Sequence, residues 1–233
     1  MGAWQGDGLT HAGRRAVNED ALVCRDRDGL WAVIDGMGGH QGGEHAAAMV
    51  RQSLQAVVLQ GGMAHRLQAV HGALQAAHDA ICQHAAVNLA GRSMGAVVAV
   101  LLLHGEQGGC LWAGDARLYR GRDQQLAQLT RDHSPVQALR DAGELSEQQA
   151  RAHPRSNLVW RAVGQGEALQ LDQLRFDVRA SDHFLLTSDG VHDALAPGAL
   201  TRLSQVGKAA GLLKAALAQG SGDNVSAVLV AKG

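Results

Sequence analysis

The chain has 233 residues, with 21 lysines and arginines against 22 aspartates and glutamates and a formal net charge of -1 at pH 7. This balance argues against nucleic acid or a membrane surface as a partner, since both are usually bound through a basic excess. The 3 cysteines are isolated in sequence, and no apolar run reaches the roughly 18 residues of a membrane span, so we expect a cytoplasmic monomer without a membrane segment.

A hairpin and two helices are predicted in the first third of the chain. The short apolar runs 21–24 and 30–34 flank an Asp-Gly turn signal, which indicates an antiparallel hairpin. Apolar residues then recur at helical spacing over 44–60 and again over 67–81. Two long amphipathic helices should therefore follow the hairpin.

A second hairpin and a polar insertion are predicted next. The continuous apolar runs 96–104 and 110–114 surround a glycine-rich turn, and 118–120 is expected to extend their sheet. The polar segment 131–165 carries a short helix after Ser134 and, further on, a Ser-x-x-Gln capping box. We expect this segment to lie over the sheet and outside the core.

The pattern of the whole chain favours an α+β fold. The remaining strands and helices are predicted at 174–178, 183–188, 197–219 (helical) and 225–231. Strand runs and helix runs are clustered and do not strictly alternate, so antiparallel sheets are favoured over a parallel doubly wound sheet.

Acidic residues stand at the ends of the predicted strands. Those that precede or follow a strand are Glu19, Asp20, Asp35, Asp115, Asp189 and Asp223, and the last is followed by Asn224. Because the start of one antiparallel strand lies beside the end of its neighbour, Glu19 and Asp20 should meet Asp35 at the open end of the first hairpin. If the other strands alternate in direction, all of these acids converge on one rim of the fold.

Such a set of carboxylates favours a hard divalent cation. Like charges at a partly dry rim raise one another's pKa unless a cation neutralises them. Oxygen ligands suit Mg²⁺ or Mn²⁺, whereas the Cys and His spacings typical of Zn²⁺ are absent from the sequence. A single aspartate beside a glycine, such as Asp35 or Asp189, is more often part of a turn. For the whole set of acids, each at the end of an apolar run, we favour a metal site.

Five motifs occur in an order that resembles a known family. They are RAVNED (15–20), DGMGG (35–39), GDARLYR (114–120), TSDGVHD (187–193) and GDNVSAVLV (222–230). With the stretch 129–164, which is similar to the flap of bacterial members, they resemble the metal-dependent protein phosphatases of the PPM or 2C type. The resemblance spans essentially the whole chain and implies one stand-alone bacterial catalytic domain over 1–233, with a flap at 131–165.

The resemblance also implies a fold and a site. The fold would be a four-layer α-β-β-α sandwich of two antiparallel sheets flanked by helix pairs. Two Mn²⁺ or Mg²⁺ ions would be held by Glu19, Asp20, Asp35, the Gly36 carbonyl, Asp189 and Asp223, with Asn224 in support. A third, weaker ion would involve Asp115 and Asp193, and Arg15 would bind the substrate phosphate. A water bridging the two ions would attack phosphorus directly, with Arg15 and Asp35 as catalytic residues.

Two positions depart from the family pattern. Met37 stands where many relatives carry a histidine proposed as general acid, so the leaving-group proton would come from water. Ala96 and Val97 stand where the family usually has two threonines, which removes a hydroxyl near the site but no expected metal ligand.

The expected function is hydrolysis of phosphoserine and phosphothreonine in proteins, in opposition to a Ser/Thr protein kinase. One alternative is a catalytically silent module that binds phosphoproteins; the intact acids argue against it. Another is a hydrolase of small phosphoesters or nucleotides, against which the lack of an aromatic or basic base-binding pocket weighs weakly.

Overall fold

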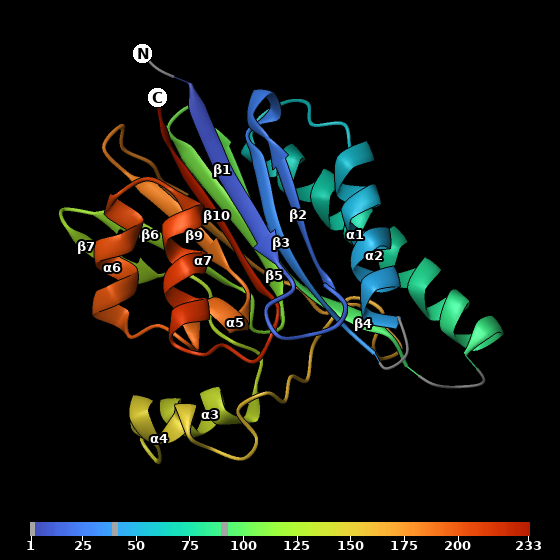
Figure 1. Ribbon diagram of the computed structural model, residues 1–233. Coiled ribbons are helices and arrows are strands. Elements are labelled where there is room, and N and C mark those ends of the chain that lie inside the picture. The colour runs from blue at the N-terminus through green and yellow to red at the C-terminus, as the bar shows by residue number, and fades with distance from the viewer. Residues whose placement is uncertain (1–2, 39–41, 90–92) are drawn as a thin grey trace.

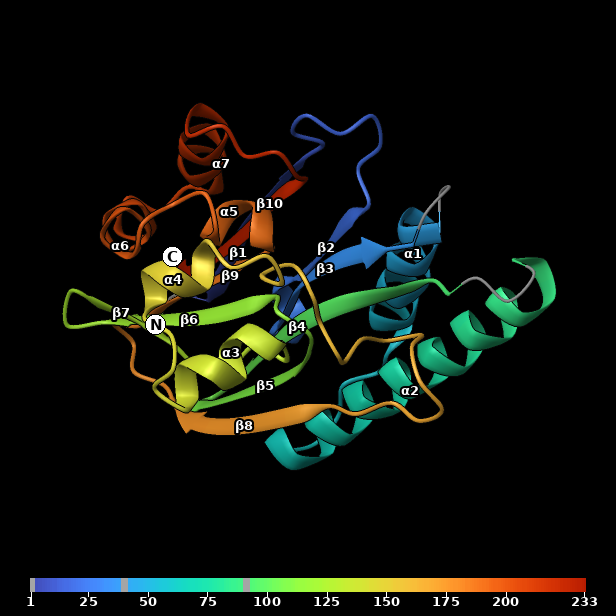
Figure 2. The same cartoon turned by 90° about the horizontal axis from the view of Figure 1, so that it is seen from below.

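Two antiparallel sheets packed face to face form the centre of the molecule, with helices on both outer faces (Figures 1 and 2). The computed structural model describes residues 3–38, 42–89 and 93–233. The predicted loop 35–39 is therefore described as far as Gly38. Within these ranges no helix combines the length and the apolar character needed to cross a membrane.

The first sheet contains both predicted hairpins. Its strands, in spatial order, are β2 (Asp20–Arg25), β3 (Leu30–Met37), β4 (Gly95–His104), β5 (Gln107–Ala113) and β8 (Asp172–Asp177). A short 3₁₀ turn, η1 (Asp26–Asp28), joins β2 to β3, and Gly29 after it has the positive φ of 67° that glycine adopts without strain.

The second sheet joins the two ends of the described chain. Its strands, in spatial order, are β1 (Trp4–His11), β10 (Val225–Lys232), β9 (His183–Thr187), β6 (Arg117–Arg122) and β7 (Gln125–Gln128). The prediction that 118–120 extends the sheet of the second hairpin is wrong, because β6 pairs with β9. Gly114, with φ 98°, turns the chain between the sheets, and a Cβ there would lie 2.1 Å from Val97 Cγ1.

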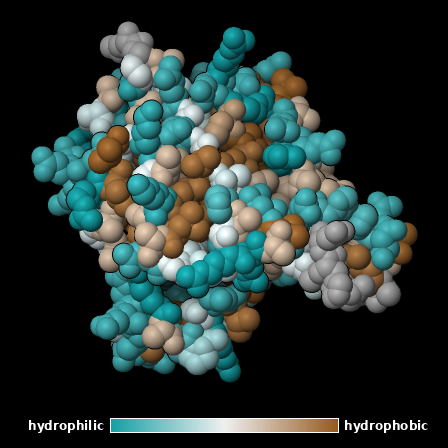
Figure 3. Space-filling view, viewed as in Figure 1, coloured by the Kyte–Doolittle hydropathy of each residue, from teal (hydrophilic) through white to brown (hydrophobic). Residues whose placement is uncertain are grey.

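Helices cover the two outer faces. The first sheet carries α1 (Gly42–Ala56) and α2 (Met63–Asn88), while the second carries α5 (Asp189–His192), α6 (Pro197–Gln205) and α7 (Ala209–Ala218). Residues of hydrophobic character gather in the middle of the face shown in Figure 3, over the region where α7, β1 and β2 lie in Figure 1. The predicted helix pairs are thus present on both sides.

Strand periodicity explains the layers. Along β3, Leu30 and Ile34 belong to the core beneath α1 and α2, whereas Trp31 and Val33 belong to the core between the sheets. A third apolar core, which includes Leu185 of β9, lies between the second sheet and its helices. Three cores between four layers confirm the predicted α+β sandwich, with β3 buried on both faces.

The predicted flap segment lies at one end of the sandwich. It contains α3 (Pro135–Asp141) and α4 (Glu147–Arg151), which stand apart from the sheets in Figure 1. Ser134 caps α3 by accepting a hydrogen bond from the Gln137 backbone, and Ser146 and Gln149 form the predicted capping box of α4.

Candidate metal centre

The first hairpin brings three predicted acids together. Asp20 and Asp35 are direct partners in the β2–β3 register, and Glu19 immediately precedes β2. The Gly36 N–H donates to the Glu19 carbonyl at 3.1 Å, which closes the open end of the hairpin. A Cβ on Gly36 would lie 2.1 Å from the Gly43 carbonyl oxygen, so glycine is required for this close approach.

Acids of the second sheet complete the cluster. Asp189 is the first residue of α5, directly after β9, and Asp223 shortly precedes β10, the neighbour of β9. Together with Asp115, which lies between β5 and β6, these acids face a cleft of about 630 Å³. The cleft is lined by Arg15, Ala16, Val17, Glu19, Asp35, Gly36, Met37, Gly38, Val97, Asp115, Asn157, Val159, Asp189 and Asp223.

Asp20 lies behind the cleft and joins the two sheets. Its Oδ2 accepts hydrogen bonds from Ser188 Oγ at 2.9 Å and from Ser226 Oγ at 2.6 Å, and both serines belong to the second sheet or its loops. Among the described residues, its Oδ1 is buried without a hydrogen-bond partner, and so is Oδ1 of Asp189. Buried carboxylate oxygens without partners are costly, which indicates that a ligand belongs there.

The acids of the cluster hold their protons unusually strongly. Burial raises the pKa of Asp20 to about 6 and that of Asp115 to about 7. Burial, followed by repulsion from neighbouring aspartates, raises the pKa of Asp35 and of Asp189 well above the ordinary range. A bound divalent cation would remove this repulsion and favour the ionised forms.

The donor set fits Mg²⁺ or Mn²⁺. Five of the residues that line the cleft carry carboxylates, the oxygen ligands that these hard cations prefer: Glu19, Asp35, Asp115, Asp189 and Asp223. Within the described residues no three His, Cys, Asp or Glu side chains stand at the spacing of a closed metal site. Mg²⁺ usually keeps several waters and takes only one or two protein carboxylates, so an open cleft suits it.

Arg15 stands at the mouth of the cleft. Its guanidinium donates to Asp223 Oδ2 at 2.8 Å, and 59% of its side chain is exposed. This ion pair raises the pKa of Arg15 still further. Arg15 is therefore a fixed cation beside the acids, where a phosphate dianion entering the cleft would meet it.

Asn224 holds the loop that carries Glu19 and Arg15. Its side-chain oxygen accepts from the Glu19 N–H at 2.8 Å, and its amide donates to the carbonyls of Ala12 and Val17 at 2.9 and 3.0 Å. All three bonds connect the start of β10 to the segment between β1 and β2.

Replacing Asn224 by alanine is expected to destabilise the protein by about 3 kcal/mol, because each lost hydrogen bond costs about 1 kcal/mol and buried groups stay unpaired. Urea denaturation measures the change. Asn88→Ala is the matched control, since the Asn88 amide bonds only within its own helix turn, to His84. Equal stabilities of the two variants would contradict this supporting role.

Three of the predicted residues, Asp20, Asn224 and Asp193, are not among those that line the cleft, and of these Asp193 faces a different space. Asp193 ends α5 and lines a smaller neighbouring cavity beneath the flap, with Arg117. Its repulsion, like that of Asp115, nevertheless contributes to the raised pKa of Asp189. Asp115 and Asp193, the residues expected at a third ion, are therefore near each other, but Asp115 faces the cleft and Asp193 faces the smaller cavity.

Sequence reasoning missed several residues of the site. Ser188 and Ser226 bind Asp20, while Asn157 and Val159 of the flap line the cleft. The serines carried a weak signal, since each lies within two residues of a motif acid or amide at a strand end. The flap residues carried none, because their position depends on how the flap folds back.

Comparison with known proteins supports the resemblance. The sequence profile of the family described as "Protein phosphatase 2C" matches residues 7–226. The serine/threonine protein phosphatase PstP of Mycobacterium tuberculosis is 32% identical over 219 residues; the match covers 92% of this chain but 42% of PstP. The chain thus spans less than half of that relative. Protein phosphatase PhpP of Streptococcus pneumoniae is 30% identical, with 78% of this chain and 77% of PhpP covered.

The folds of solved protein structures match this chain over nearly its whole length. PppA, described as a key regulatory component of T6SS in Pseudomonas aeruginosa, superposes with a TM-score of 0.90 at 33% identity, covering 99% of this chain and 98% of PppA. The catalytic domain of PstP in complex with 2 manganese ions superposes with a TM-score of 0.86 at 29% identity, covering 99% of each chain. With its profile match, its two-sheet sandwich and its acidic cleft, this chain belongs to the 2C-type (PPM) serine/threonine protein phosphatase family.

Proposed function

We propose that this chain is a metal-dependent phosphatase that hydrolyses phosphoserine and phosphothreonine in proteins. The observation that carries the proposal is the pair of buried carboxylate oxygens without partners, Oδ1 of Asp20 and of Asp189, at an acidic cleft. A divalent cation would satisfy such oxygens and at the same time neutralise the charge of the surrounding carboxylates. One catalytic domain spanning 1–233, with 131–165 as its flap, is part of the proposal.

Different residues of the chain would hold the metal ions, bind the phosphate and support the site. Two Mn²⁺ or Mg²⁺ ions would be held by Glu19, Asp20, Asp35, the Gly36 carbonyl, Asp189 and Asp223, and a third by Asp115 and Asp193. Such ions, when bound, acidify water and neutralise charge on a phosphoryl group. Arg15 binds and orients the phosphate oxygens through its planar fork. Asn224 keeps the Glu19 segment in place.

Met37 cannot supply the proton that the leaving oxygen requires. Met37 lines the cleft, and its sulfur accepts a hydrogen bond from Gln165 Nε2 at 3.5 Å. A thioether has no acidic proton, so water must protonate the leaving oxygen. Val97, also on the wall, contributes no hydroxyl.

The partners proposed are phosphorylated proteins and a cognate Ser/Thr protein kinase. Support comes from the relatives PstP, which is named a serine/threonine protein phosphatase, and PhpP, which is named a protein phosphatase. We also propose a cytoplasmic monomer with no nucleic-acid or membrane partner, consistent with the near-neutral charge of the chain.

An assay of two substrates tests the function. With Mn²⁺, the protein is expected to hydrolyse both p-nitrophenyl phosphate and a phosphothreonine peptide, and EDTA is expected to abolish both activities because the acids alone repel phosphate. Turnover that persists in EDTA would contradict the metal-dependent mechanism.

The same assay separates the alternatives. Activity on the aryl ester without activity on phosphopeptides would favour a small-phosphoester hydrolase. Tight phosphopeptide binding without turnover, in protein shown to bind Mn²⁺, would favour a silent binding module.

A further inference from the structure

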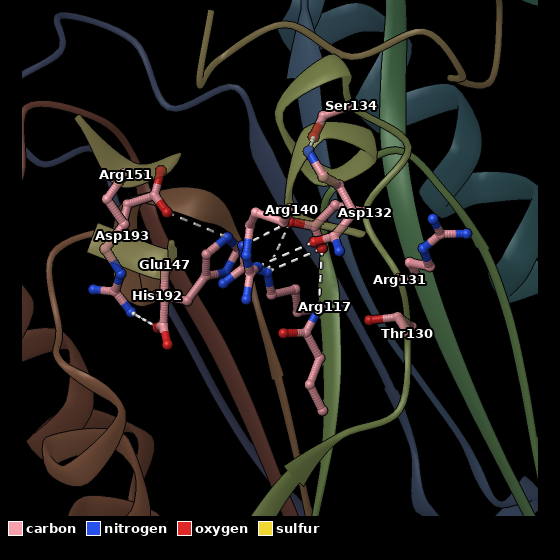
Figure 4. Close-up of polar contacts among 12 residues, drawn as sticks. Arg117, Thr130, Arg131, Asp132, Ser134, Arg140, Glu147, Arg151, His192 and Asp193 are labelled. Carbon is pink, nitrogen blue, oxygen red and sulfur yellow. Dashed lines mark hydrogen bonds and ion pairs between the residues drawn. The ribbon is translucent and has the colours of Figure 1, made fainter. Parts of the chain in front are cut away.

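Two adjoining cavities lie between the flap and the body of the molecule, outside the catalytic cleft. The smaller measures about 40 Å³ and the larger about 180 Å³, and both are lined by Arg117, Arg140, Glu147 and Arg151. The arginines come from three different elements, β6, α3 and α4 (Figure 4). Three guanidinium groups around one small space are unusual, because like charges repel unless something lies between them.

Two of the arginines are neutralised by acids of their own. Arg117 holds Asp132 through Nε and NH2, with a shortest contact of 2.6 Å, and both side chains are nearly buried. Arg151 pairs with Glu147 at 3.0 Å, and its other terminal nitrogen donates to the Leu195 carbonyl. The Arg117–Asp132 pair attaches the start of the flap to β6, and the bond from Arg151 to the Leu195 carbonyl attaches α4 to the body.

Arg140 is different. Within the described residues no carboxylate lies within ion-pair distance of its guanidinium, and its recorded hydrogen bond goes to Gln137 Oε1, one turn back in α3. An arginine has five N–H donors, so most of those on Arg140 are available to a ligand. Its side chain is half-buried and lines both cavities.

The rest of the wall supplies further donors. Ser134 Oγ accepts a hydrogen bond from the Gln137 backbone, which leaves its O–H group to donate into the smaller cavity. Asp193 is the one acid of that wall without an arginine partner among the described residues. Its carboxylate lies 3.9 Å from Nε2 of His192, whose pKa is lowered well below the usual range by burial, so this histidine is neutral. Arg140 and Ser134 therefore face the space with donors, opposed by a single carboxylate.

We propose that the cavity beneath the flap is a second anion site, which binds a tetrahedral oxyanion of the phosphate class between Arg140, Arg117 and Arg151. The volume of about 40 Å³ exceeds what one water needs and suits one such ion. A guanidinium fork matches the geometry of a phosphate oxygen pair. The bound ion would connect α3 and α4 to β6 and so fix the flap on the body.

This site is distinct from the phosphate position proposed at Arg15, and only the importance of a fixed flap for a phosphatase rests on the proposed function. Free inorganic phosphate and a phosphate carried by a phosphopeptide share the required chemistry. The enclosed shape of the smaller cavity favours the free ion, and comparison of inorganic phosphate with a doubly phosphorylated peptide separates the two sources.

Anion binding can be measured without turnover. Isothermal titration with sulfate is carried out on Mn²⁺-loaded protein in an Arg15→Gln background, which removes the guanidinium at the catalytic cleft. Adding Arg140→Gln is expected to weaken sulfate binding about tenfold, since a charge-assisted hydrogen bond contributes about 1.5–3 kcal/mol and 1.4 kcal/mol is tenfold. Arg140→Lys should retain part of the affinity.

Arg155→Gln is the matched control, because it removes the same charge from an exposed arginine of the flap. A crystal soaked in selenate locates the anion directly, through selenium density among Arg117, Arg140 and Arg151. Equal sulfate affinities of the Arg140→Gln and Arg155→Gln proteins, or selenium density confined to the catalytic cleft, would overturn the proposal. Since neither readout involves catalysis, an inactive protein that binds sulfate here would contradict only the proposed function.

Discussion

Asp35→Asn is expected to lower the turnover of p-nitrophenyl phosphate with Mn²⁺ by about a thousandfold or more. Asp35 belongs to β3, faces the cleft and lies opposite Asp20. In the proposed site Asp35 would be a metal ligand, and ions of this kind contribute several kcal/mol of transition-state stabilisation, with 1.36 kcal/mol for each tenfold change in rate. An amide of the same shape keeps the packing but binds divalent cations poorly.

The same substitution should stabilise the metal-free fold. Burial and the neighbouring aspartates raise the pKa of Asp35 well above its usual range, so ionised Asp35 is unfavourable and its removal relieves repulsion. The control is Asp177→Asn, at the exposed end of β8. Full activity of Asp35→Asn, or an equal loss in Asp177→Asn, would contradict the proposed role.

Removal of metal is expected to make stability fall with rising pH. A carboxyl whose pKa is raised by folding stabilises the protein fully below its unfolded pKa of about 3.8, and this contribution disappears as the pH passes its folded pKa. Burial raises the pKa of Asp115 to about 7, and the pKa values of Asp35 and Asp189 are raised well above the ordinary range, so the loss extends through neutral pH.

The window above pH 6.5 isolates this effect. Burial lowers the pKa of the histidines His78, His133, His183 and His192, which therefore change stability only below about pH 6.5. Between pH 6.5 and 8 the free energy of unfolding in EDTA should fall by about 2 kcal/mol, at up to about 1.4 kcal/mol per proton and pH unit. Urea denaturation at both pH values measures it.

Mn²⁺ should reverse this trend, because metal binds the ionised carboxylates and competes with protons. Stabilisation by Mn²⁺ is therefore expected to grow from pH 6.5 to 8. A metal-free protein that becomes more stable over the same interval would show that the acid cluster does not control stability.

The meeting of Glu19, Asp20 and Asp35 could be predicted from the sequence, because it follows from local rules. Two apolar runs with a turn signal between them specify a hairpin, and a hairpin specifies which residues face one another. The meeting with Asp189 and Asp223 depended on how two sheets pack, which strand periodicity alone does not determine. There the order of family motifs provided the information.

The strand β1 (Trp4–His11) was not predicted from the sequence, and its glycines explain why. Gly6 and Gly8 are typical of a loop, yet both lie in a strand. A Cβ on Gly6 would lie 2.3 Å from Trp31 Nε1, and one on Gly8 would lie 2.9 Å from Cys24 Sγ. These two glycines allow β1 to approach the other sheet closely, and no local sequence pattern indicates such a tertiary contact.

α5 (Asp189–His192) was hidden in a similar way. The pair Asp189-Gly190 is a common turn signal. In the structure it begins a helical turn, in which Val191 packs into the third core. A Cβ on Gly190 would lie 2.0 Å from the Asn224 carbonyl oxygen, so glycine is needed for contact with the start of β10.

The two serine hydroxyls on Asp20 have a consequence for the folding pathway. Asp20 is separated from Ser188 by 168 residues and from Ser226 by 206, so these bonds close some of the longest loops in the chain. Neither sheet alone contains the full acid cluster; it exists only once the sheets have met. The repulsion between Asp20 and Asp35 arises already within the first sheet, whereas their repulsion with Asp189 and Asp223 arises only when the sheets dock. A divalent ion bound by acids of both sheets would therefore stabilise the docked arrangement at a late step of folding.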